Sequence, residues 1–301
     1  MICNSLRRSA GAIFAAVLAT SVAVADSHRL DPNDPDDALT IGRKIGCSTN
    51  DGEPITYWWH GKAYSRRQGE RDRMLFLVEG MNVRQCASVD DPEKGEGYKL
   101  VSREILLYKD AETGEPLAKW DNPWTGQTVD VLHVANDPVN FTSYKIGRDG
   151  KPATFRGDIL GDRWWTTNAI PLFYPNPLAS DYQKEIGGTY HATEMFNFMG
   201  DVDSLLDPET TTAQVQVGWV RMSDWLPWMM MEGREGVIYM HTAGRKLDSW
   251  DDMSDTMKNE IDKHYPDYVA PPPLDDTRRN ETSWIYYKRV KEGERTAPKR
   301  D

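Results

Sequence analysis

The sequence predicts a mainly β protein, built as an antiparallel lipocalin-like barrel or barrel-like sandwich with one C-terminal helix. Two observations lead to this prediction. From about residue 41 to residue 245, short apolar runs alternate with clusters of Gly, Asn, Asp and Pro, which is typical of antiparallel sandwiches and barrels. Near the C-terminus, Met253, Met257 and Ile261 recur at every fourth residue, which indicates a helix with one packing face.

Eight segments have the apolar content and the flanking turn residues expected of strands. They are residues 74–81, 98–108, 117–120, 128–135, 141–146, 189–199, 212–222 and 236–243. Asp149-Gly150 supplies the signal of a tight hairpin turn after the fifth segment. We also expect a last strand at residues 284–290.

The C-terminal helix has recognisable ends. Ser249 can cap its first turn, with Asp252 three residues further on, and Pro266 stops it. Three consecutive prolines within residues 270–274 predict an extended strap after the helix.

The N-terminus has the three parts of a secretory signal. Arg7 and Arg8 precede an uncharged apolar run at residues 10–22, and Ala23-Val24-Ala25 fits the cleavage rule for signal peptidase. We therefore expect residues 1–25 to be removed and the mature protein to work in the periplasm. A buried N-terminal helix is the alternative, and the sequence does not decide between the general secretory and the twin-arginine routes.

The expected mature chain is a single acidic domain. Residues 26–40 form a polar lead-in, residues 41–291 the β-rich domain and residues 292–301 a polar tail. Loss of two arginines with the signal leaves 34 basic against 47 acidic residues, a formal net charge of −13. This balance disfavours nucleic acid and anionic membrane surfaces as partners. No later apolar run is long enough to insert into a membrane, and the oligomeric state stays open.

Two cysteines, Cys47 and Cys86, remain after processing. In an oxidising compartment they can form a disulfide, but they can equally be buried and free, because spacing alone does not place them within bonding distance.

Four motifs together carry a family resemblance. They are the segments 120–126 (WDNPWTG), 173–178 (FYPNPL), 190–194 (YHATE) and 223–229 (SDWLPWM). In order and spacing they resemble a bacterial family known as domain of unknown function 1838. The resemblance covers about residues 40 to 270. It implies a single, often exported domain and no particular activity.

Alternation along the strands indicates which polar side chains point inward. Glu194 shares one face of its strand with Tyr190 and Phe196. Arg221 shares one face of its strand with Trp219 and valines. We therefore expect Glu194 and Arg221 in the interior among aromatic residues.

The same test predicts further interior groups. His133 shares a face with two valines, and Tyr239 shares a face with His241. Glu79 lies in a run that is apolar on both faces. Buried charges must be paired or have a shifted pKa. One interpretation is a structural Glu–Arg pair with hydrogen-bonded core histidines. The other is a general acid/base cluster in a cavity.

The eleven tryptophans allow two interpretations as well. They can be ordinary core residues, or several can line a pocket for a flat apolar ligand. The predicted substrate-binding residues are Trp219, Tyr190, Phe196, Tyr239, Trp165, Trp228 and Glu79.

We therefore expect a cofactor-independent periplasmic enzyme, a lyase, isomerase or hydrolase, that acts on an apolar or aromatic small molecule in a barrel cavity. The predicted catalytic residues are Glu194, His133, Arg221 and His241. Glu194 or His133 would move the proton, and Arg221 would hold developing negative charge. A non-catalytic carrier using the same cavity and an envelope interaction module are the alternatives.

No metal is expected. Motifs of zinc proteases, redox dithiols, elbow-type serine hydrolases and nucleotide enzymes are missing from the sequence. A two-histidine, one-carboxylate site from His133, His241 and Glu194 stays open in principle, but no linear spacing supports it.

Overall fold

The fold is taken from a computed structural model, which describes residues 29–176, 178, 181–182, 187–231 and 233–300. The predicted signal at residues 1–25 lies outside the described residues. The fold is mainly β and antiparallel, as predicted. One ten-stranded sheet has the order β6-β3-β2-β1-β12-β11-β10-β9-β8, with β7 also paired to β3, and β4 and β5 form a separate hairpin.

The strands follow the chain as β1 (Ile55–Arg66), β2 (Arg73–Asp91), β3 (Gly95–Lys109), β4 (Lys119–Asp121), β5 (Thr128–Asp130), β6 (Val134–Asn136), β7 (Phe141–Tyr144), β8 (Asp158–Leu160), β9 (Arg163–Pro175), β10 (Thr189–Asp201), β11 (Gln216–Ser223) and β12 (Val237–Lys246). The helices are α1 (Pro35–Gly46), α3 (Val202–Leu206), α4 (Asp255–His264) and α5 (Ser283–Lys291), with short 3-10 turns η1 (Pro227–Met229), η2 (Trp250–Asp252) and η3 (Pro266–Val269).

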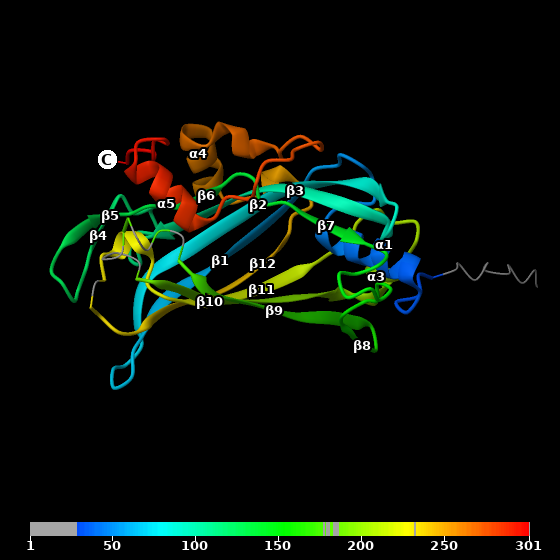
Figure 1. Cartoon of the computed structure of the whole chain (residues 1–301), viewed down its shortest axis with the longest axis horizontal. Coiled ribbons are helices and arrows are strands. Elements are labelled where there is room, and N and C mark those ends of the chain that lie inside the picture. The colour runs from blue at the N-terminus through cyan, green and yellow to red at the C-terminus, as the bar shows by residue number, and fades with distance from the viewer. Residues whose placement is uncertain (1–28, 177, 179–180, 183–186, 232, 301) are drawn as a thin grey trace, which may run out of the picture.

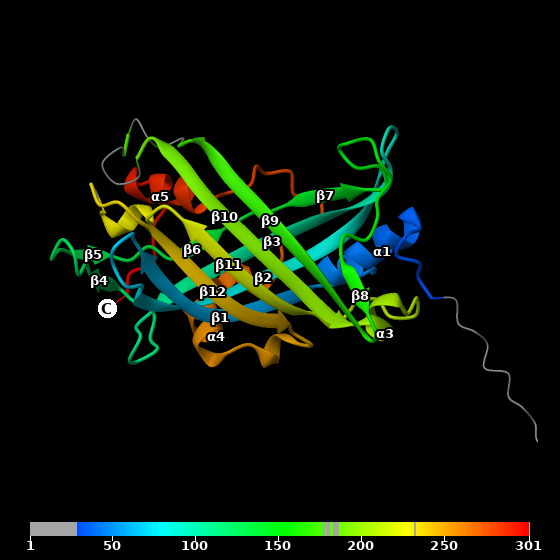
Figure 2. The ribbon, with the colours of Figure 1, turned by 90° about the horizontal axis from the view of Figure 1, so that it is seen from below.

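The large sheet is strongly curved but, over the residues that the structure describes, does not close into a barrel. Its hydrogen-bonded order ends at β6 and β7 on one side and at β8 on the other. Figure 1 shows β2 and β3 on one side of the curve and β9 and β10 on the other, and Figure 2 shows β9 to β12 and β1 side by side. Tyr108 of β3 shares one apolar core with Tyr190 of β10 and Trp219 of β11. We call the face that carries these three residues the inner face.

Two long strands, β1 and β9, fall where no strand is predicted. The sequence of β9 contains Pro171 and Pro175, and proline disfavours a central strand because it cannot donate to the ladder. β9 tolerates both because, past Trp165, the described residues pair with it on one side only, through β10. The predicted strand at residues 128–135 is instead two short strands, β5 and β6.

The helical parts also differ from prediction. The C-terminal helix exists as α4, but it begins later than expected, because Ser254 accepts from the backbone of Met257 and caps it. Ser249 and Asp252 form a capping box around the short turn η2. The segment predicted as a last strand is helix α5, capped by Thr282. The lead-in contains helix α1, with Asp34 as its cap and a proline in its first turn.

The helices occupy distinct places around the sheet. α4 packs through Met257 and Ile261 against Met81 and Val83 of β2, on the face opposite to the inner face, which we call the outer face. α5 lies next to β6. Its Trp284 packs in the apolar core of the inner face, and its Tyr286 packs in the apolar core between the outer face and α4. α1 and α3 lie at the other end of the sheet, away from the β4–β5 hairpin (Figure 1).

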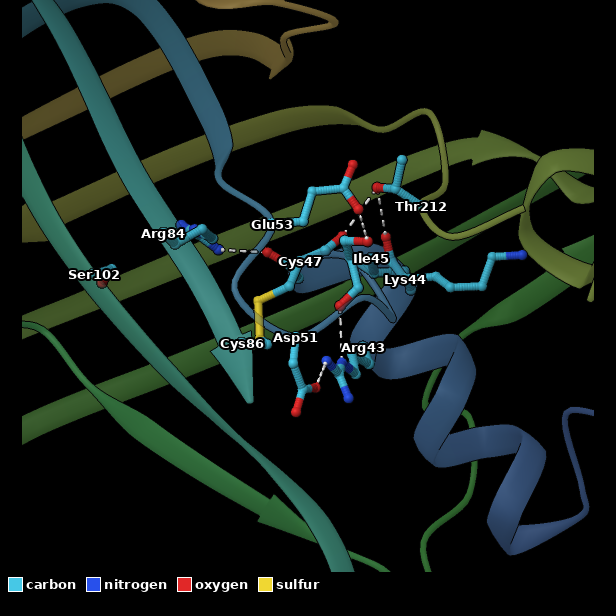
Figure 3. Close-up of a disulfide and its surroundings, with 12 residues drawn as sticks. Arg43, Lys44, Ile45, Cys47, Asp51, Glu53, Arg84, Cys86, Ser102 and Thr212 are labelled. Carbon is cyan, nitrogen blue, oxygen red and sulfur yellow. Dashed lines mark hydrogen bonds and ion pairs between the residues drawn. A yellow bond between two sulfur atoms is a disulfide. The ribbon is translucent and has the colours of Figure 1, made fainter. Parts of the chain in front are cut away.

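A disulfide between Cys47 and Cys86 ties the end of α1 to β2, with their Cα atoms 6.0 Å apart (Figure 3). Both sulfurs are buried against Tyr98 and Leu100 of β3. The bond therefore fixes the C-terminal end of α1 beside the inner face of β2 and β3.

Candidate functional site

The clearest polar feature of the inner face is an ion pair between β10 and β11. Glu194 lies directly opposite Arg221 in the strand register, and Arg221 Nη1 donates to Glu194 Oε1 over 2.5 Å. The Nη2 atom of Arg221 donates to the hydroxyl of Tyr190. The side chains of Arg221 and Glu194 are 14 % and 22 % exposed. The predicted placement of Glu194, Arg221, Tyr190, Phe196 and Trp219 on one inner face is confirmed.

The charge of Arg221 is well secured. Burial alone would lower the pKa of its guanidinium, but Glu194 and the hydroxyls of Tyr190 and Tyr108 outweigh burial and raise that pKa above its ordinary value. Arg221 is therefore a permanent positive charge held in place on the inner face.

A second carboxylate, Glu104 of β3, faces this pair across the curved sheet. Asn136 Nδ2 donates to Glu104 Oε1 over 2.6 Å, and no cation of the described residues forms an ion pair with it within 4.0 Å. Burial is the main cause that raises the pKa of Glu104, and the nearby charge of Glu194 adds to it, while Asn136, Arg221 and Arg84 oppose it. The raised pKa and the lack of an ion-pair partner make Glu104 the inner-face carboxyl most suited to exchange a proton.

Glu104 was not predicted, although the alternation test can find it. On β3 it shares a face with Leu106 and Tyr108, which belong to the inner core. Its cross-strand partners are Asn82 on β2 and Asn136 on β6. The inner face thus carries a polar cluster, which consists of Asn82, Arg84, Glu104, Asn136, Glu194 and Arg221.

Aromatic side chains lie beside the polar cluster. The ring of Trp59 covers Gly80 of the neighbouring strand, where an added Cβ would come within 2.4–2.5 Å of the indole. Trp219 lies 6.3 Å from Trp59 and 6.5 Å from Phe196, measured between ring centroids. Trp59 and Phe196 are only partly buried. A flat apolar molecule bound at this part of the inner face would contact aromatic rings next to charged groups.

Three buried polar atoms of this region have no hydrogen-bond partner among the described residues. They are Trp59 Nε1, Arg221 Nε and Asn136 Oδ1. A buried polar group without a partner costs about 1–3 kcal/mol, so such groups are rare unless a ligand or water satisfies them. Their position together on the inner face favours a polar ligand there.

Several predicted site residues lie elsewhere. Glu79 is buried, but on the outer face beneath α4, where it accepts from Trp58 Nε1 at 2.8 Å, from Lys109 Nζ at 2.6 Å and from the Ser254 hydroxyl. Its predicted place in the cavity is therefore wrong. Glu79 anchors α4 to the sheet.

Tyr239 and His241 also point outward. Their neighbour on the same strand, Met240, is opposite Arg221 and belongs to the inner core, so the alternate residues face away from it. His241 is exposed, and Tyr239 donates to the carboxylate of Asp72 on the outer surface. The predicted interior placement of both is wrong, because β12 is apolar on two sides at this point and alternation cannot distinguish them.

The two other predicted tryptophans differ in place. Trp165 is opposite Met199 and lies on the outer face, beside a shallow depression of about 520 Å³. Trp228 packs with Phe76 and Tyr108 in the inner core near the β4–β5 hairpin. Only Trp228 is thus near the inner face.

His133 is a structural residue in the loop that precedes β6. Its Nδ1 accepts from the Tyr108 backbone over 3.0 Å, and its Nε2–H donates to the Leu117 carbonyl over 3.0 Å. Burial lowers the pKa of His133 to about 3. The predicted role as a base is not supported by this geometry, because both ring nitrogens are already engaged. The alternation test misplaced His133 because it assumed an unbroken strand.

The lowered pKa of His133 predicts that the free energy of unfolding depends on pH. Its pKa is lower in the folded state than the ordinary 6.5, so the unfolded chain binds more protons between these values, and stability falls as the pH falls below about 6.5. By pH 4.5 the loss from this residue should be about 2–3 kcal/mol. Urea unfolding at pH 7 and 4.5 measures it. His133→Gln should start less stable and lose less on acidification; an equal loss in both proteins would contradict the assignment.

The three groups of the possible metal site do not meet. Glu194 is on the inner face, His241 on the outer face and His133 inside a hydrogen-bonded loop. Across the part of the chain that the structure describes, no group of three or more His, Cys, Asp or Glu side chains could hold a metal ion. Nor is any described helix long and apolar enough to cross a membrane.

Fold and site together define a mainly β protein with a curved antiparallel sheet and a polar cluster among aromatic residues on its inner face. Residues 52–291 match the family described as protein of unknown function (DUF1838), and the chain belongs to this family. The resemblance seen in the four sequence motifs is thus confirmed. No curated protein matches the chain.

Proposed function

We propose that this protein is a cofactor-independent enzyme that binds a small molecule with an apolar or aromatic body on the inner face and moves a proton with Glu104. The observation that carries the proposal is Glu104 itself, a carboxyl with a raised pKa, no ion-pair partner among the described residues, and a fixed guanidinium opposite it. The inner face of the curved sheet would hold the ligand, as the closed cavity does in a small barrel.

The chemistry that fits is proton transfer next to an oxygen-bearing group. The Glu104 carboxylate would remove a proton from carbon, and the electron pair would shift to an oxygen whose negative charge Arg221 stabilises. Protonated Glu104 would then return the proton at another carbon, which is isomerisation, or a leaving group would depart, which is elimination. Glu194 and Tyr190 would hold Arg221 in position. This reassigns the proton transfer from Glu194, which is already ion-paired, to Glu104.

A carrier that binds without conversion is the second candidate. The partly exposed aromatic rings of Trp59 and Phe196 support binding as well as they support catalysis. The two differ in turnover alone. The purified protein should be screened against aromatic and apolar small molecules by quenching of tryptophan fluorescence, and each binder should then be incubated and followed by mass spectrometry or NMR. Conversion of at least one binder supports the enzyme; binding of several with conversion of none would replace the enzyme by the carrier.

We further propose that the protein works in the periplasm after export. The disulfide between Cys47 and Cys86 supports an oxidising compartment, and the Arg7-Arg8 pair with the apolar run behind it supports a cleaved signal. Protein recovered from the periplasm should begin at Asp26 and show no free thiol when unfolded without reductant. An N-terminus at Met1, or two titratable thiols, would contradict export or the disulfide respectively.

A further inference from the structure

Arg84 of β2 is the one guanidinium of the polar cluster that lacks a carboxylate partner. No carboxylate of the described residues lies within 4.0 Å of its nitrogens. Its Nε donates to Asn82 Oδ1 over 2.7 Å, and its guanidinium lies 4.7 Å from the centre of the Tyr57 ring. These contacts orient the side chain but do not neutralise its charge.

Among the described residues, the charged neighbours of Arg84 are one cation, Lys246, and one carboxyl, Glu104, which lies beyond ion-pair distance. Lys246 of β12 is buried, and the charge of Arg84 is near enough to contribute to the lowering of its pKa. Lys246 Nζ donates to the carbonyls of Lys44 and Cys47 at the end of α1. Arg84 Nη1 itself reaches the Gly46 carbonyl only at 3.5 Å, which is a weak contact (Figure 3). The carbonyl groups at the C-terminal end of α1 are thus bound mainly by Lys246. The position of Arg84 is therefore not explained by capping of this helix.

Arg84 lies beside the proposed proton-transfer residue. In the register Asn82 is opposite Glu104, and Arg84 is two residues further along β2, so Arg84 and Glu104 are diagonal neighbours on the inner face. Cross-strand diagonal neighbours lie about 7–8 Å apart, within reach of long side chains. An anionic group bound by Arg84 would therefore lie next to the carboxyl of Glu104 and the aromatic ring of Tyr57.

From this arrangement we infer that Arg84 binds the anionic end of the ligand, and that the ligand is a small aromatic or apolar monocarboxylate. The inference rests on the proposed function and names the class of molecule that the same site takes. The planar guanidinium matches a carboxylate with two hydrogen bonds. Arg221 is already ion-paired with Glu194, whereas Arg84 has no carboxylate of the described residues within 4.0 Å and can form both hydrogen bonds with a ligand.

The test compares one carboxylate with its neutral isostere. Binding of 2-naphthoate and of 2-naphthamide is measured by tryptophan-fluorescence quenching in the wild type, in Arg84→Met and in Arg84→Lys. A charge-assisted hydrogen bond should make the wild type prefer the carboxylate by about 10- to 100-fold. Arg84→Met should remove the preference while leaving affinity for the amide unchanged, and Arg84→Lys should retain part of it. Arg245→Met, an exposed arginine on the outer face of β12, is the matched control and should change neither affinity.

The outcomes separate this inference from the proposed function. Equal wild-type affinity for the two probes, or a preference that survives Arg84→Met, overturns the role of Arg84 and leaves a ligand site on the inner face. Failure of both probes to bind at millimolar concentration overturns the inferred ligand class. If other probes of the wider screen then bind and are converted, the proposed function stands; if none binds, it fails too. Thermal unfolding of Arg84→Lys shows whether loss of binding reflects loss of the fold.

Discussion

Replacement of Glu104 by Gln should lower turnover by about 10²–10⁴-fold, the usual loss when a general acid or base is removed. Gln has nearly the same shape and keeps an oxygen that can accept from Asn136 Nδ2, so the fold and ligand affinity should change little. The measurement is steady-state kinetics with a substrate found in the screen, beside the dissociation constant from fluorescence quenching.

Two variants complete this experiment. Glu96→Gln changes an exposed carboxylate on the same strand and should leave turnover unchanged. Glu194→Gln weakens the ion pair to Arg221 and should reduce stability more than chemistry. If Glu194→Gln instead abolishes turnover in a stable protein while Glu104→Gln remains active, Glu194 is the proton-transfer residue and the assignment to Glu104 is wrong.

Replacement of Arg221 by Met should destabilise the protein by about 3–5 kcal/mol, the cost of leaving a buried charge without its partner. The charge left behind is Glu194, with the Tyr190 hydroxyl also losing its partner. Urea unfolding measures the loss. Arg163→Met is the matched control, because the Arg163–Asp201 pair lies at the exposed end of β9 and β10, with side chains 59 % and 49 % exposed. Surface pairs contribute about 0–1 kcal/mol.

A double variant tests whether the uncompensated charge is the cause. Removing both partners in Arg221→Met with Glu194→Leu should recover most of the lost stability, because a buried pair can often be replaced by apolar residues at little cost. The double variant should nevertheless have lost turnover. If the two single losses simply add, the pair does not interact as described.

Alternation along single strands predicted the inner face well where a strand is long and has one polar and one apolar side. This holds for β10 and β11, so Glu194 and Arg221 were placed correctly. It fails at His133 because the chain breaks between β5 and β6, and at His241 because both sides of β12 are apolar. It fails at Glu79 because α4 covers the outer face of β2, so that both faces of this strand are buried.

Other features depend on contacts distant in sequence. The aromatic and β-branched residues of 284–290 favour a strand, but Thr282 caps a helix there and Trp284 and Tyr286 each find an apolar core. The open sheet could not be distinguished from a barrel, because closure depends on pairing of the first and last strands. That Glu104 faces Arg221 follows from the curvature of the whole sheet and has no local signal.

The central claim is that the ligand binds on the inner face, and tryptophan substitutions test it most directly. Trp59 and Trp219 lie on that face, whereas Trp165 lies on the outer face. Quenching by a ligand found in the screen is measured in Trp59→Phe, Trp219→Phe and Trp165→Phe. We expect the first two variants to lose much of the quenching and the third to retain it. Loss of quenching in Trp165→Phe, with full quenching in the other two, would place the ligand on the outer face and contradict the proposed site.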